Sequence, residues 1–269
     1  MKIATFNCNS VRARIPIITR WLEKEKPDIL ALQEIKVETD KFPREPFEHL
    51  GYRCEVRGRK GHAGVATLSL MVPDEVNAGF RDGDESEHSR ILACTWHAHL
   101  AHDISGRANL HVINTYVPQG QEMESEQFRY KLEWLDRLRA VLDEHYSKRE
   151  LVLWLGDFNV APEPIDVYDS KRIMGHVAHN PEVFEALRKV REWGFLDLFR
   201  KFHPDEEGQY TFWDYRMRDS FGRNTGWRVD HIYVTDSLAR KARACWIDRE
   251  PRAMEKPSDH TFLVGEFDL

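Results

Sequence analysis

Residues 151–159 read LVLWLGDFN, an apolar run that stops abruptly at Gly156-Asp157-Phe158-Asn159. A continuous apolar run of this length predicts a buried strand. Three other apolar runs stop in the same way: residues 2–6 at Asn7, residues 28–32 at Gln33 and Glu34, and residues 110–115 at Tyr116. The sequence therefore predicts several strands whose ends carry polar side chains.

Two further runs carry their polar residues at the start. Residues 230–234 begin with Asp230, and residues 259–264 begin with Asp259 and His260. Because the end of one strand lies beside the beginning of its antiparallel neighbour, all these residues can share one rim of a sheet. The expected rim contains Asn7, Glu34, Tyr116, Asp157, Asn159, Asp230, Asp259 and His260.

This rim gathers four carboxylates, which repel one another unless positive charge lies among them. The chain has no Cys-x-x-Cys pair and no set of several histidines at this rim, so a zinc site is not indicated. Oxygen-rich ligand sets favour hard cations. We therefore expect Mg²⁺ or Mn²⁺ as the cofactor.

The composition is typical of a globular protein, with 41% of the 269 residues hydrophobic and 31% charged. No Gly/Ser/Pro-rich linker divides the chain, so we expect a single domain over residues 1–269. We expect no signal peptide and no membrane partner, because no apolar h-region follows the first residues and no apolar stretch could span a bilayer. The four scattered cysteines are typical of free thiols in a reducing cytoplasm.

The net charge of −6 is unfavourable for a protein that binds nucleic acid, although four of the negative charges belong to the rim. Local basic patches matter more than the total charge for binding a polyanion. The candidate patches are Arg53, Arg57, Arg59, Lys60 and His62; Arg216, Arg218 and Arg223; Lys171 and Arg172; and Arg12 and Arg14. Each patch fits a solvated face equally well.

Hydrophobic periodicity predicts the helices. Residues 125–146 give the clearest helix. Its expected core stripe consists of Phe128, Leu132, Leu135, Leu138 and Leu142. A first helix is expected to contain Pro16 as an early residue, and another to begin at Asn180-Pro181 and stop at Gly194.

The segments between these helices complete the pattern. Residues 51–72 predict a hairpin with its tip at residues 58–64, residues 88–98 predict a strand, and residues 161–179 predict a functional loop. Two halves of mixed strands and helices then meet where the polar strand ends converge. We expect an α/β fold, a four-layer sandwich in which two mixed β-sheets pack face to face with helices outside.

Gly-Asp at a strand end and Ser-Asp before a strand are each common in turns and caps, so neither motif is specific alone. Their order along the chain is specific. The motifs are residues 5–10 (TFNCNS), 32–36 (LQEIK), 116–120 (YVPQG), 156–162 (GDFNVAP), 227–230 (WRVD) and 258–260 (SDH). Together they resemble the exonuclease III family of abasic-site endonucleases, within the endonuclease/exonuclease/phosphatase superfamily, from residue 2 to the C-terminus.

The superfamily also includes pancreatic-type DNases, sphingomyelinases, inositol polyphosphate phosphatases and deadenylases. Two features favour the DNA-repair branch: the Gln33-Glu34-Ile35-Lys36 motif, and the aromatic residues 210–216 that precede residues 226–230. The resemblance implies that Phe212, Trp227 and Val229 form an apolar pocket for a flipped-out sugar without its base. The alternative is that these residues are only core packing.

The resemblance implies a metal-dependent DNA phosphodiesterase of base excision repair that cuts 5′ to abasic sites, with 3′–5′ exonuclease and 3′-phosphatase activity. The expected partner is double-stranded DNA with abasic sites or 3′ ends, and the protein is expected to act as a monomer. Such hydrolysis needs an activated water, neutralised phosphoryl charge and help for the leaving oxygen.

The resemblance also implies roles for the rim residues. Glu34 binds the metal, with Asn7 and Asp259 completing or supporting the ligand set. Asp157 takes a proton from the attacking water, and Asn159 orients the water or phosphate; both lie close enough to count among the candidate metal ligands. The remaining expected roles are phosphate contacts by Tyr116 and His260, support of the His260 ring by Asp230, and backbone contacts to DNA by Arg59, Lys60, Lys171 and Arg216.

The chain departs from the family at three places. Asn9 stands where some members have Asp, and Ala63 stands where Ser is common. The polar residues 99–107 match nothing in the family, and their role is open. Two other functions also remain open: a phosphodiesterase of RNA or phosphorylated small molecules, and a binding protein without catalysis. Neither the balance of nuclease activities nor the number of catalytic metals follows from the sequence.

Overall fold

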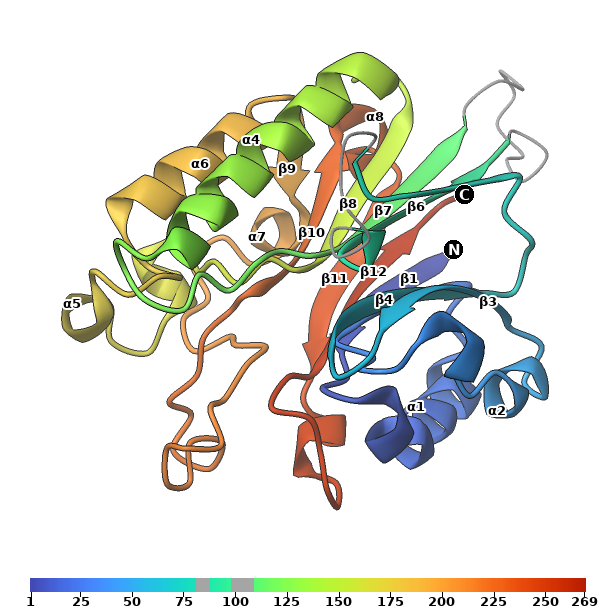
Figure 1. Ribbon diagram of the computed structural model, residues 1–269, viewed down its shortest axis with the longest axis horizontal. Coiled ribbons are helices and arrows are strands. Elements are labelled where there is room, and N and C mark those ends of the chain that lie inside the picture. The colour runs from blue at the N-terminus through green and yellow to red at the C-terminus, as the bar shows by residue number, and fades with distance from the viewer. Residues whose placement is uncertain (81–87, 98–108) are drawn as a thin grey trace.

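The structure is a computed structural model that describes residues 1–80, 88–97 and 109–269. Two six-stranded sheets form its centre (Figure 1). The stretch 99–107 and the end of the expected strand 88–98 lie outside the described residues.

The first sheet has the strand order β11-β12-β1-β2-β4-β3. It is mixed, because β1 runs parallel to β2 while the other neighbours are antiparallel. Its strands are β1 (Lys2–Asn7), β2 (Ile29–Gln33), β3 (Arg53–Arg59), β4 (His62–Ser69), β11 (Ala242–Asp248) and β12 (Phe262–Phe267).

The second sheet has the order β5-β6-β7-β8-β10-β9, and its one parallel pair is β7 with β8. Its strands are β5 (Glu75–Ala78), β6 (Ile91–Trp96), β7 (Leu110–Tyr116), β8 (Leu151–Asp157), β9 (Phe195–Asp197) and β10 (Asp230–Thr235).

Helices cover the outer face of each sheet, as Figure 1 shows. Helices α1 (Val11–Glu25) and α2 (Glu45–Glu48) lie on the first sheet, and α4 (Glu126–His145) and α6 (Pro181–Arg191) lie on the second. The shorter helices are α5 (Ser170–Ile173), α7 (Leu198–Phe202), α8 (Asp236–Ala239), and the 3₁₀ turns η1 (Thr39–Lys41), η3 (Pro164–Asp166) and η4 (Glu250–Ala253). Among the described residues, no helix combines the length and apolar character needed to cross a membrane.

Three apolar clusters lie between the two helix layers and the two sheets and hold them together. The central layer joins the two sheets, for example through Ile29 and Ala31 of β2 and Leu153 and Leu155 of β8. The outer layers join the first sheet to α1 and the second sheet to α4 and α6. The expected four-layer α/β sandwich is therefore confirmed.

Two details of the helices differ from expectation. Helix α1 begins at Val11, so Pro16 lies inside it rather than at its first turn. In α4, Lys131 takes the inner position that the expected stripe gave to Leu132. The spacing of Phe128, Lys131 and Leu135 is a regular helical stripe, and a lysine occupies its middle position.

Candidate active site

The polar strand ends meet at one rim. Asn7 at the end of β1 lies beside Gln33 at the end of β2. On the second sheet, Asp157 at the end of β8 pairs with both Tyr116 of β7 and Asp230 of β10. Residues from all these strands therefore lie within reach of one another, together with the segment 258–260 that leads into β12.

Asn7 joins the two sheets at this rim. Its buried amide Nδ2 donates to Glu34 Oε1 at 2.9 Å and to Asp157 Oδ2 at 2.8 Å. Asn159 holds the other oxygen, because its backbone N–H donates to Asp157 Oδ1 at 2.8 Å. Asp157 thus has both oxygens fixed by neutral donors.

His260 lies between two carboxylates. Its Nδ1 is 2.8 Å from Asp230 Oδ2, and its Nε2 is 3.9 Å from Asp157 Oδ2. Burial opposes a charged ring, but Asp230 and Asp157 outweigh burial and raise the pKa of His260. Burial raises the pKa of Asp157, and the negative charges of Asp230 and Glu34 add to this while His260 opposes it.

Glu34 is held in its ionised form. Burial alone would raise its pKa, but the hydrogen bond from Asn7 and the ion pair with Lys36 lower it below the usual value. The Lys36 Nζ lies 2.8 Å from Glu34 Oε2 and 2.5 Å from Asn9 Oδ1. Asn9 in turn donates to Asp259 Oδ1 at 2.9 Å. The protein itself therefore supplies part of the positive charge expected among the carboxylates.

The rim offers two places for a metal ion. Ligand atoms of Asp157, Asp230 and His260 lie within 4.8 Å of one another, and Asp230 Oδ1 is buried without a hydrogen-bond partner among the described residues. A protonated His260, however, has no lone pair to offer a metal. Glu34 and Asp259 line the same cavity with carboxylate oxygens, and this donor set fits a hard cation better.

Tyr116 is kept as a neutral phenol. Burial raises its pKa well above the usual value, and the charges of Glu34 and Asp157 raise it further. Its hydroxyl therefore keeps its proton and can donate a hydrogen bond at neutral pH. Tyr116 lines the cavity with Glu34 and Asp157.

An aromatic wall adjoins these charged residues. A cavity of about 440 Å³ is lined by the carboxylates and by Phe212, Trp227 and Val229. The ring centroid of Phe212 lies 4.9 Å from that of His260. The ring centroids of His176 and Trp227 lie 4.6 Å apart, with the two planes at 86°. Phe212 and Trp227 are partly exposed in this cavity, unlike residues of the interior core.

The expected DNA-binding residues lie at different distances from the cavity. Arg216 lines it, with an ion pair of 2.7 Å to Asp214. Arg59 and Lys60 lie at the tip of the β3–β4 hairpin, which extends past the rim because Gln33 pairs with Val65. Lys171 belongs to α5, in the segment that also carries His176. The tip of this hairpin is shorter than the expected residues 58–64, since only Lys60 and Gly61 form its turn.

Sequence reasoning missed several lining residues: Gln119, His176, Ala178 and Tyr215. Gln119 lies within the YVPQG motif, which could have identified it. His176 and Ala178 lie in the aperiodic segment 161–179, where residue type alone gives no signal.

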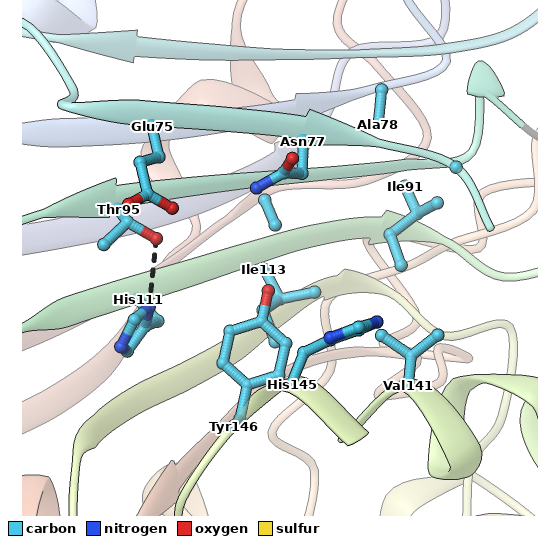
Figure 2. Close-up of a pocket in the computed structure, with 12 residues that line it drawn as sticks. Glu75, Asn77, Ala78, Ile91, Thr95, His111, Ile113, Val141, His145 and Tyr146 are labelled. Carbon is cyan, nitrogen blue, oxygen red and sulfur yellow. Dashed lines mark hydrogen bonds between the residues drawn. The ribbon is translucent and has the colours of Figure 1, made fainter. Parts of the chain in front are cut away.

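A second cavity, of about 370 Å³, lies on the outer face of β5, β6 and β7 beside the end of α4 (Figure 2). Thr95 and His111 form a hydrogen bond of 2.9 Å at its edge. None of the residues described as lining it is lysine or arginine, so it does not suit a DNA phosphate. The rim cavity is the better candidate for phosphodiester chemistry.

Comparison with known proteins gives consistent matches. Residues 4–260 match the endonuclease/exonuclease/phosphatase family. An exodeoxyribonuclease III from Haemophilus influenzae is 35% identical over 99% of this chain and 100% of its own length. An AP endonuclease structure from Archaeoglobus fulgidus is 44% identical, with a TM-score of 0.92 and full coverage of both chains. A 3′ phosphatase from Neisseria bound to a product DNA hairpin is 35% identical, with a TM-score of 0.88 over both full chains.

Proposed function

Because the chain belongs to the exonuclease III branch of the endonuclease/exonuclease/phosphatase family, we propose that it cuts the DNA backbone 5′ to abasic sites. The relatives identify it as a hydrolase, a nuclease of DNA repair. Cleavage beside abasic sites is supported by one observation above all: the aromatic wall of the cavity lies directly against His260. A phosphate held at His260 would bring the adjoining sugar against Phe212 and Trp227.

The proposed cofactor is Mg²⁺ or Mn²⁺. Glu34 and Asp259 would hold the ion, and Asn7 would fix Glu34 through its hydrogen bond of 2.9 Å. Asp157 and Asn159 lie beside this position as further candidate ligands. A bound divalent cation would neutralise charge on the scissile phosphate.

Protein side chains would accept the proton of the attacking water and donate hydrogen bonds to the phosphate. Asp157, with its raised pKa, is suited to accept a proton from the attacking water, and the backbone N–H of Asn159 keeps that carboxylate oriented. His260 would donate from Nε2 to the phosphate, while Asp230 fixes the ring through Nδ1. Tyr116 would donate its hydroxyl to a phosphate oxygen.

The cavity wall would select the damaged site. A deoxyribose that lacks its base can enter a space lined by Phe212, Trp227 and Val229 that excludes a full nucleotide. Arg59, Lys60, Lys171 and Arg216 would hold the DNA backbone on either side. The same site could remove 3′-terminal nucleotides or phosphates, as the names of the Neisseria relatives suggest for those proteins.

We propose that residues 1–269 act as a single catalytic domain and a monomer. A cytoplasmic location also stays a prediction. The four cysteines are buried and unpaired, as expected in a reducing compartment.

Competition between substrates tests the function. The protein is incubated in Mg²⁺ with a labelled duplex that carries one abasic analogue, and unlabelled competitors are added in turn. An abasic duplex should compete much better than intact duplex, single-stranded RNA or an inositol polyphosphate. Equal competition by RNA or the inositol phosphate would replace the DNA-repair assignment with one of the other superfamily activities.

A further inference from the structure

Lys131 is a fully buried lysine on the inner face of α4. Its Nζ donates to three backbone carbonyls: Gln119 at 3.1 Å, Asn159 at 2.7 Å and Val177 at 2.9 Å. A lysine ammonium has three N–H donors and no acceptor, so all three donors are used.

Each acceptor belongs to a different loop of the rim cavity. Gln119 and Asn159 line the cavity themselves. Val177 lies between His176 and Ala178, which also line it. One ammonium group therefore crosslinks the loop after β7, the loop after β8 and the segment that precedes α6.

The loop at Gly120 packs closely against the Lys131 side chain. Gly120 has a φ of +97°, and a Cβ at Gly120 would lie 3.2 Å from the Lys131 Cδ. The loop thus approaches the lysine stem at a distance that favours glycine. Burial lowers the pKa of Lys131 to about 7, and the charge of Asp157 opposes this shift, although within the described part of the chain no carboxylate lies close enough to form an ion pair with the Nζ.

A buried ammonium without an ionic partner is unfavourable, and an apolar residue would avoid that cost. Without the lysine, however, the buried carbonyl of Val177 would lack a donor, at a cost of about 1–3 kcal/mol, and the carbonyls of Gln119 and Asn159 would each lose a charged donor. The presence of a lysine at this buried position is therefore explained by the three loops whose carbonyls it binds. It is not explained by a gain in hydrophobic packing.

Asn159 is the loop residue closest to the chemistry. It has a left-handed backbone with a φ of 50°, which is uncommon outside glycine. Its N–H donates to Asp157 Oδ1, its side-chain Nδ2 donates to Val117 O at 3.0 Å, and its carbonyl accepts from Lys131. The lysine completes the set of contacts that fixes this residue beside Asp157.

We propose that Lys131 is a positioning residue, which acts through Asn159 to hold Asp157 and the loops of the rim cavity in the geometry for phosphodiester hydrolysis. It does not touch the substrate. This inference rests on the proposed function of the same site.

The test compares Lys131→Met, which keeps the length of the side chain but removes its donors, with Lys131→Gln, which keeps one donor group. The matched control is Lys201→Met, because Lys201 also donates to a backbone carbonyl, that of Ala239, but lies outside the rim cavity. Single-turnover cleavage of an abasic duplex and equilibrium binding to it are measured for each. The same substitutions are then made in an Asp157→Ala background, which removes the carboxylate held by the backbone N–H of Asn159.

We expect Lys131→Met to lower the single-turnover rate by about 10- to 100-fold while the Kd for DNA changes less than about threefold, as expected for a misplaced catalytic group. Lys131→Gln should fall between this variant and the wild type, and Lys201→Met should match the wild type. In the Asp157→Ala background, Lys131→Met should have little further effect on the rate, because the carboxylate that the Asn159 N–H holds in place is already absent and residues that act as one unit are not additive. A general loss of stability would instead lower the rate by the same factor in both backgrounds, and that result would overturn the inference.

A measurement on the wild-type protein covers the case in which Lys131→Met does not fold. ¹⁵N NMR at a pH below the lowered pKa of Lys131 should show a lysine ammonium whose protons exchange slowly with water, and Lys131→Gln should remove that signal. Absence of such a signal from the wild type would overturn the inference. If the wild-type protein does not cleave abasic DNA, the proposed function fails as well. If it cleaves and the effects of the two substitutions are additive, only the role of Lys131 is overturned.

Discussion

Asp157 and Asp230 are neighbouring acids with different partners. Asp157 receives donors from Asn7 and Asn159, whereas Asp230 Oδ2 contacts His260 Nδ1 at 2.8 Å. We expect Asp157→Asn to lower the single-turnover rate by about 10²–10⁴, the usual range for loss of a general base. Asp230→Asn keeps an amide oxygen for the His260 ring and should lower the rate less. Near-normal rates for Asp157→Asn with an inactive Asp230→Asn would mean that the two roles are reversed.

Phe212 and Trp227 are partly exposed in the rim cavity, where an interior core would have buried them. Phe212→Ala and Trp227→Ala should reduce the preference for an abasic over an intact duplex by about tenfold or more, because each removes part of the apolar wall against which the baseless sugar packs, and tenfold corresponds to about 1.4 kcal/mol. Binding to intact duplex should change little. Phe184→Ala on α6 is the control, since Phe184 is also partly buried but packs on a different cluster. Wild-type preference in both cavity variants would show that these aromatics only pack.

The rim acids could be predicted at the level of single residues because each lies at the end or the beginning of an apolar run. Lys131 could not, because a lysine in an amphipathic helix is ordinarily a surface residue. Its acceptors are backbone carbonyls 12, 28 and 46 residues away, and backbone groups carry no sequence signature.

At the scale of elements, strands β7 and β8, helix α4 and the start of α6 were predicted to within a few residues. Strands β5, β9 and β11 and helix α7 were missed. β5 and β9 have only 4 and 3 residues and lie at sheet edges, so their apolar patterns are too short to detect. In β11, polar and half-buried positions replace a clear alternation.

The β3–β4 hairpin carries Arg59 and Lys60 past the rim. If both side chains contact phosphates, Arg59→Ala with Lys60→Ala should lower the slope of log affinity against log salt by about two units, one for each contact. Lys241→Ala with Arg243→Ala is the control, because these residues lie at the opposite end of the first sheet, where Ala242 pairs with Phe267. A slope unchanged by the hairpin substitutions would mean that the hairpin is simply solvated.

His111 on strand β7 makes the stability of the folded protein depend on pH. Burial lowers the pKa of His111 below its usual value of 6.5, so the unfolded chain binds a proton more readily than the folded protein. The contribution of neutral His111 to the free energy of unfolding is therefore fully present above pH 6.5. It is lost as the pH falls through the pKa of His111 in the folded protein. His111→Gln should reduce the difference between urea unfolding free energies at pH 7.5 and pH 5, and His145→Gln at the same cavity is the control. An undiminished difference in His111→Gln would assign the acid sensitivity to other groups.

At the scale of the whole molecule, the site exists only because the two sheets pack face to face. Asn7 from the first sheet contacts Asp157 from the second across 150 residues of sequence. The layered α/β architecture could be predicted from alternating strands and helices. The pairing of β1 with β12 and the angle at which the sheets meet depend on long-range packing, which local patterns do not encode.

The rim is proposed to hydrolyse the DNA backbone beside abasic sites with the help of a divalent cation. The most direct measurement uses a duplex with one abasic analogue, labelled at either end of the damaged strand, to map the position of cleavage. In Mg²⁺ we predict one early cut immediately 5′ to the abasic site; a chelator should abolish it, and added Mg²⁺ or Mn²⁺ should restore it. Cleavage that ignores the abasic site would rule out selection of the damaged sugar by the rim cavity, and cleavage at full rate in the chelator would rule out the divalent cation.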